Sequence, residues 1–196
     1  MTEQDIHQRL LAEFEEAILD FEGGEKQPAI AVEPLRLRDV ALYLRDQQDL
    51  AFDRCLVISG VDWEGFDESG KGKHREINRY EEDGTVGPVE EAATGDLGVV
   101  YFLESSRHGH RLKLSVRIPR ESPRVDSLAS VWTTADWGER ETYDFYGIDF
   151  LGHPDQRRIL LPEDWEGWPL RKDYQMPSRY HDVPLEGMPY AVREER

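Results

Sequence analysis

Two adjacent segments, residues 97–103 and 111–118, restrict the fold of this chain most strongly. Residues 97–103 read LGVVYFL and are apolar almost throughout, whereas residues 111–118, RLKLSVRI, alternate apolar and polar side chains. A period of two places the apolar side chains of a strand on one face. His108 and Gly109 lie in the short polar stretch between the two runs. The pattern predicts an antiparallel hairpin with one face on a hydrophobic core.

Helical spacing predicts a first helix over residues 2–21. Thr2 and Asp5 have the spacing of a capping box, and two glycines at 23 and 24 are a stop signal. The apolar positions of this predicted helix are Ile6, Leu10, Phe14, Ile18 and Phe21.

Shorter patterns predict the remaining elements. Residues 29–32 and 55–59 are compact apolar runs typical of buried strands. Helices are predicted over residues 38–46, 127–134 and 137–146. For the last helix, Asp136 and Glu139 have capping-box spacing and Gly147 is a C-terminal stop.

These patterns predict an α+β fold in which a small mixed β-sheet is packed with helices. The expected division is an α+β domain over residues 1–146, with an acidic loop at about 62–96, followed by an extended irregular C-terminal arm over 147–196. The arm is rich in Trp, Tyr and Arg, the residue types that dominate protein interfaces. Composition leaves two interpretations open: the arm wraps its own domain, or it binds a partner.

Charge and cysteine content exclude several classes of function. The formal net charge is −17, from 41 acidic and 24 basic residues, which disfavours nucleic acid and anionic membrane surfaces as direct partners. The single cysteine, Cys55, closes no disulfide within the chain and is too few for an iron–sulfur cluster. No apolar run approaches the length of a membrane span, and a reducing cytoplasm is the expected compartment.

Two motifs are reminiscent of ligand sites but lack essential groups. Residues 65–72, GFDESGKG, nearly match a phosphate-binding loop, but Gly72 stands where Ser or Thr would hold magnesium. His108 and His110 have the spacing of metal ligands on one strand face, with no nearby Cys or carboxylate pair to complete a set. A glycine-rich surface loop and a polar hairpin tip are the favoured interpretations. Cys55, in an apolar strand, is expected to be inert.

Glu139, Arg140 and Glu141 form a charged triplet among aromatic residues. Arg140 and Asp144 are four residues apart on the predicted helix and can pair. The triplet fits either a buried ion-pair lock, which we favour, or acid–base chemistry. A stand-alone hydrolase that uses Glu139, Glu141 and His153 is therefore one alternative function.

Residues 135–174 closely resemble the signature of the respiratory-chain NADH dehydrogenase 30-kDa subunit family, the C subunit of bacterial NADH–quinone oxidoreductase (complex I). Similarity extends upstream to residues 58–62, ISGVD, and to the hairpin order. Gln156, Gly138 and the long acidic stretch depart from the family pattern. The matching residues, expected to be structural or interfacial, are Trp137, Glu139, Arg140, Glu141, Tyr143, Asp144, Gly147, Gly152, His153, Pro154, Arg157, Arg158, Pro169, Arg171, Lys172 and Asp173.

The resemblance implies a non-redox structural subunit in the peripheral arm of a proton-translocating NADH–quinone oxidoreductase. It implies no catalytic, cofactor-binding or metal-binding residue in this chain, with flavin, iron–sulfur clusters and quinone in partner subunits. The expected partner is the large quinone-site subunit. Contact with the membrane would be indirect, on the cytoplasmic side of the cell membrane. The equivalent subunit of a related membrane-bound hydrogenase or ferredoxin–quinone reductase is the alternative within this resemblance.

Overall fold

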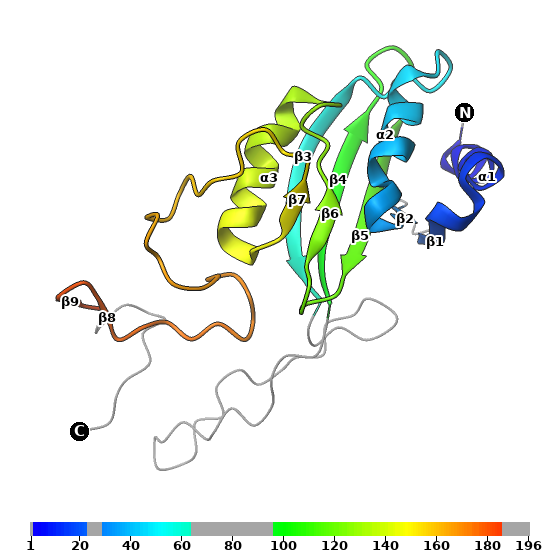
Figure 1. Cartoon of the computed structure of the whole chain (residues 1–196). Helices are drawn as coiled ribbons and strands as arrows, with labels where there is room; N and C mark the ends of the chain where they lie inside the picture. Colours follow the sequence, from blue (N-terminus) through cyan, green and yellow to red (C-terminus); the bar gives the residue numbers. More distant parts are fainter. Residues whose placement is uncertain (1, 23–28, 64–95, 186–196) are drawn as a thin grey trace, which may run out of the picture.

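A five-stranded mixed sheet forms the centre of the computed structural model, which describes residues 2–22, 29–63 and 96–185 (Figure 1). The strand order is β1-β2-β5-β4-β3, and every neighbouring pair is antiparallel except β2 and β5. The strands are β1 (Ile18–Glu22), β2 (Ala29–Val32), β3 (Arg54–Asp62), β4 (Leu97–Glu104) and β5 (Arg111–Ile118). The predicted α+β class is confirmed.

The predicted hairpin is present as β4 and β5, in a register without a break. Tyr101 lies opposite Leu114, and Leu97 lies opposite Ile118. All four of these side chains are fully buried. The alternating pattern of β5 thus places one face of the hairpin on the core, as its sequence predicts.

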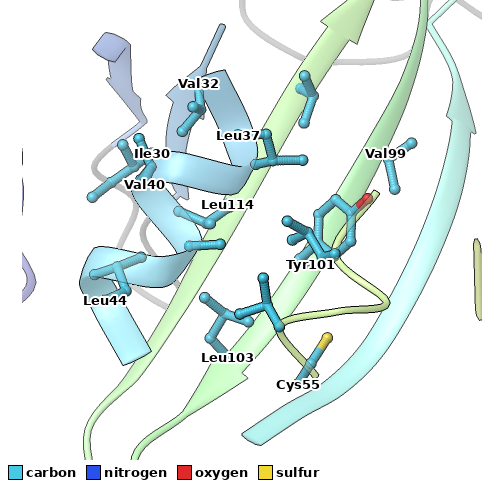
Figure 2. Packing of buried hydrophobic residues seen from close by; sticks show 14 of the residues in the cluster. Ile30, Val32, Leu37, Val40, Leu44, Cys55, Val99, Tyr101, Leu103 and Leu114 are labelled. Atoms are coloured by element: carbon cyan, nitrogen blue, oxygen red, sulfur yellow. The ribbon is translucent and has the colours of Figure 1, made fainter. Parts of the chain in front are cut away.

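Three α-helices of the described residues contribute to the core: α1 (Glu3–Phe14), α2 (Leu37–Asp46) and α3 (Thr133–Tyr146). Figure 2 shows the apolar face of α2, with Leu37, Val40 and Leu44, directed at Leu114 and Tyr101 of the hairpin. α1 lies beside α2, where Arg9 donates to the hydroxyl of Tyr43 at 2.9 Å. α3 lies beside β3, at the opposite edge of the sheet (Figure 1).

The first predicted helix is too long, and a β-bulge explains the error. The Thr2–Asp5 capping box is present, but α1 ends at Phe14, and Ile18 and Phe21 belong to β1. The register shifts between Ile18 and Asp20, so Ile18 opposes Val32 and Phe21 opposes Ile30. An extra residue in a strand puts side chains three apart on one face, a spacing that imitates a helix. The predicted glycine stop lies outside the described residues.

Two further predictions are corrected around α3. Residues 127–132 form turns rather than a helix, and α3 begins at Thr133. The predicted Asp136–Glu139 capping box does not form, because the Glu139 carboxylate instead accepts from Ser127 and Leu128. β3 is an edge strand rather than a fully buried one. Leu56 and Val57, beside a second register shift, are 43% and 54% exposed.

The start of the C-terminal arm belongs to the core. β6 (Arg124–Asp126) and β7 (Asp149–Leu151) form a parallel pair, and Ile148 and Phe150 are buried in the main hydrophobic cluster. Beyond Leu151 the chain is irregular, and its last described part, around β8 and β9, lies away from the sheet (Figure 1). A short antiparallel pair follows, made by β8 (Arg179–Tyr180) and β9 (Val183–Pro184). Of the predicted acidic loop, residues 64–95 lie outside the described part.

Two glycines allow α3 to approach β3 closely. A Cβ atom at Gly60 of β3 would lie 2.4 Å from the ring of Tyr146, and one at Gly138 of α3 would lie 2.9 Å from Cβ of Ile58. The departure noted at Gly138 thus has a packing reason, since a side chain there would push the helix off the strand.

We expect Gly60→Ala to destabilise the isolated protein by about 1–3 kcal/mol, because the Tyr146 ring must move from its packed position. Urea unfolding at equilibrium measures this loss. Ser59→Ala, one residue away and on the other face of β3, is the matched control and should change the free energy of unfolding by less than about 0.5 kcal/mol. Equal stability of the two variants would contradict the close α3–β3 contact.

Candidate interaction site

Most of the signature residues lie along α3 and on the part of the arm that follows it. His153 contacts Asp136 at the start of α3, Asp155 lies nearest Arg140, and residues 158–161 surround Asp144. Residues 153–161 therefore run beside α3 in the same direction as the helix. The structure thus brings together two segments that the sequence motif presents as consecutive.

Asp144 is the centre of this arrangement. One oxygen of its buried carboxylate accepts from the backbone N–H groups of Ile159, Leu160 and Leu161 at 3.0, 2.7 and 3.0 Å. The other accepts from Arg158 Nη1 at 2.9 Å. Burial alone would raise the pKa of Asp144, but these hydrogen bonds outweigh it and lower the pKa. The Arg140–Asp144 pair that the helical spacing allows does not form, because Arg158 occupies this carboxylate.

Arg158 connects Asp144 to the next part of the arm, residues 165–168. Its Nη2 donates to the carbonyl oxygens of Trp165 and Gly167, each at 3.0 Å, and its guanidinium lies over the ring of Trp168. That ring occupies the space beside Gly147, where a Cβ atom would lie 2.3 Å from it. Gly147 ends α3 in the left-handed conformation, φ 65°, as the sequence predicts. Gly147 therefore both ends the helix and leaves the space that the Trp168 ring fills.

A second tie fastens the arm to the end of β3. Asp62, which is buried, accepts from the side chain of Arg120 and, at 2.8 Å, from the backbone N–H of Lys172. Arg120 also donates to Asp173 at 3.1 Å. Arg171 donates from Nε to the carbonyl oxygen of Tyr146 at 2.7 Å. The signature residues 171–173 thus bind the domain itself.

Glu139 joins the β6–α3 turn to the sheet. Its carboxylate is fully buried and accepts from the Ser127 hydroxyl at 2.6 Å, the Leu128 N–H at 2.7 Å and the Tyr101 hydroxyl at 3.4 Å. Burial raises the pKa of Glu139 to about 7, despite the three donors that favour the ionised form.

The residues of the hydrolase alternative do not converge. Glu141 is exposed on α3, whereas Glu139 is buried beneath the helix. The imidazole of His153 is fully buried and bonds through Nε2 to the carbonyl oxygen of Asp136 at 3.1 Å, while Nδ1 accepts from the Asp155 N–H. No two of these three side chains are hydrogen-bonded to each other in the described residues.

The other motifs that were considered have structural explanations or lie outside the description. His108 and His110 bond to the carbonyl oxygens of Gln48 and Leu50 at 2.9 and 2.7 Å. Burial raises the pKa of Cys55 to about 12, so its thiol stays protonated. Within the described ranges no group of three or more His, Cys, Asp or Glu is placed to hold a metal ion. The glycine-rich segment 65–72 lies outside them.

The sequence does not predict which apolar side chains of the arm are exposed, nor the hydrogen bonds that Asp62 makes. Leu160, Leu170 and Val183 of the arm are 61%, 50% and 62% exposed. Isolated leucines in an irregular segment carry no periodic signal, so only the structure separates them from buried ones. The role of Asp62 was equally hidden, because its partners lie 58 and 110 residues away in sequence.

The side chain of Trp137 lies on the solvent-facing side of α3 and is 63% exposed. The guanidinium of Arg140 lies over this ring, 4.8 Å from the ring centroid.

None of the helices in the described ranges is long and apolar enough to cross a membrane.

The fold and these ties define an α+β protein whose C-terminal arm is fastened to one helix by buried charges. Residues 30–180 match the family described as respiratory-chain NADH dehydrogenase, 30-kDa subunit. The chain belongs to this family.

Curated relatives are named as the C subunit of NADH-quinone oxidoreductase. The chain is 39% identical over 188 residues to the relative of that name from Chlorobium phaeobacteroides, covering 92% of this chain and 96% of that one. It is 37% identical over 172 residues to the relative from Chloroherpeton thalassium, covering 87% of this chain but 60% of that longer protein.

Two solved structures share the fold at low sequence identity. One is the trypsin-resistant fragment of Nqo5, with a TM-score of 0.51 and 24% identity, covering 76% of this chain and 97% of the fragment. The other is a chain of the membrane-bound sulfane sulfur reductase, an archaeal respiratory membrane complex. It has a TM-score of 0.60 and 21% identity, covering 88% of this chain and 85% of that chain.

Glu139→Gln should change how stability depends on pH. A raised pKa in the folded state means that the protonated carboxyl favours folding. This contribution is complete below pH 4.5, falls as pH rises, and is lost above about pH 7. Between these two pH limits, the contribution of this carboxyl to the free energy of unfolding changes by about 3 kcal/mol.

Glutamine stays neutral, so the variant should gain stability relative to the wild type between pH 5 and pH 8, as measured by urea unfolding at several pH values. Glu141→Gln, on the exposed side of α3, is the control and should follow the wild-type profile. Parallel profiles for wild type and Glu139→Gln would show that this carboxyl does not titrate in the range.

Proposed function

We propose that this chain is a non-redox structural subunit in the peripheral arm of a proton-translocating NADH–quinone oxidoreductase. The family match over residues 30–180, together with 39% identity to a named C subunit along nearly its whole length, carries this proposal. Flavin, iron–sulfur clusters and quinone then belong to partner subunits. The chain sits peripherally, on the cytoplasmic side of the membrane, and reaches it through the complex. The names of the relatives favour this assembly over a related hydrogenase or reductase.

The arm is the proposed contact with the large quinone-site subunit. Buried charges hold its irregular backbone on α3 and β3, while Leu160 and Leu170 remain exposed. An ordered segment that presents apolar side chains to solvent has the character of an interface that is formed before binding. We place the boundary between domain and arm after Leu151 rather than after residue 146, because Ile148 and Phe150 are core residues.

The test uses the tagged full-length chain and native membranes that lack this subunit. We expect the wild-type chain to recover the large quinone-site subunit and NADH–quinone reductase activity, and to oxidise no NADH alone. The double variant Leu160→Ala with Leu170→Ala should bind at least a hundredfold more weakly, because burial of each leucine side chain contributes about 2 kcal/mol.

The matched control is Leu19→Ala with Leu35→Ala, two leucines that are 57% and 56% exposed on the N-terminal elements. This pair should bind as the wild type does. Equal weakening by both pairs would move the contact away from the arm. Failure of the wild-type chain to recover any subunit of the oxidoreductase would contradict the proposed function itself.

A further inference from the structure

Arg140 is buried without the acceptors that a buried guanidinium needs. Its side chain is 8% exposed, and its Nε, fully removed from solvent, makes no hydrogen bond in the described part of the chain. The carboxylate within ion-pairing reach is Asp155, whose Oδ2 lies 4.0 Å from Nη1, beyond hydrogen-bond length. Buried charged donors are almost always hydrogen-bonded, because leaving them unpaired is costly.

None of the neighbouring acids makes a hydrogen bond to Arg140 in the described residues. Asp155 accepts from Nε of Arg157 at 3.1 Å, using the oxygen that also faces Arg140. Asp136, one turn earlier on α3, has its Oδ1 3.6 Å from the imidazole Nε2 of His153, and this buried oxygen accepts no hydrogen bond in the described residues. Asp144, one turn later, is occupied by Arg158. Among the described residues, Arg140 therefore has no carboxylate oxygen within hydrogen-bond distance, and its nearest ion-pair partner lies 4.0 Å away.

Trp137 places an exposed aromatic ring directly beside this buried cation. Its ring stacks with the Arg140 guanidinium at 4.8 Å, which fixes the cation in place, yet the side chain is 63% exposed. Trp and Arg are the residue types most often found at the energetic centres of interfaces. An exposed tryptophan next to an unsatisfied arginine offers both an apolar contact and a charge to complement.

We propose that Arg140 and Trp137 form a receptor for a carboxylate side chain of the neighbouring subunit, presented on a segment that also covers the indole ring. A carboxylate that reaches Arg140 accepts two hydrogen bonds from its planar fork, which a lysine at this position could not reproduce. This inference rests on the proposed function and specifies a second contact, separate from the leucines of the arm.

The first experiment separates binding from folding. Arg140→Gln should lower the urea midpoint of the isolated full-length chain less than Arg158→Gln does, because it removes a stacking contact with Trp137 but no close ion pair. The same variant should weaken binding to membranes that lack this subunit at least tenfold. Arg158→Gln is the control for a paired arginine and should lower the urea midpoint. A destabilised Arg140→Gln that binds normally would overturn the proposal.

The second experiment identifies the acceptor. Arg140→Lys, with and without Asp155→Asn, is assembled on the membranes and treated with a carbodiimide, which joins an amine to a carboxylate in contact with it. We expect a cross-link from position 140 to an Asp or Glu of another subunit in both variants, absent from the wild type.

Coupling only to Asp155 of the same chain, with none in the double variant, would show that the acceptor is internal and would overturn the proposal. If the wild-type chain recovers the oxidoreductase while Arg140→Gln binds equally well, this inference fails and the proposed function stands.

Discussion

The carboxylate of Asp144 is the interaction on which the C-terminal half of the molecule depends. It lies in the last turn of α3, and three successive N–H groups of the arm point at one of its oxygens. Such a run of amides is a natural site for an anion. Arg158 neutralises the buried charge and passes the connection on to residues 165–168. Residues 158–161 have no regular secondary structure, so their hydrogen bonds to this carboxylate are what hold them on α3.

This arrangement answers the question that composition left open about the aromatic arm. Trp168 packs on Gly147 and Tyr143, and residues 171–173 bind α3 and β3, so much of the arm wraps its own domain. Leu160 and Leu170 of the arm and Trp137 of α3 remain on the surface. The two interpretations are thus complementary: buried charges fix the arm, and the fixed arm presents the side chains that we propose for partner binding.

The sequence predicts what depends on local periodicity, and fails where tertiary contacts replace it. The β4–β5 hairpin, α2 and the αL glycine at 147 follow from period and stop signals. The bulge in β1 gives its apolar residues a helix-like spacing. The position of Glu139 imitates that of a capping residue, whereas its carboxylate accepts from the hydroxyls of Ser127 and Tyr101. The signature spans α3 and the arm that follows it, but the pairing of Asp144 with Arg158 follows only from the return of the arm beside the helix.

Hydrogen exchange at three amides tests the central claim most directly. In the isolated full-length protein, the N–H groups of Ile159, Leu160 and Leu161 should be protected, although they lie outside any helix or strand. Asp144→Asn should remove this protection while the amides of β4 and β5 keep theirs. Unprotected amides at 159–161 in the wild type, or protection that survives in Asp144→Asn, would contradict the account of an arm fixed by one buried carboxylate.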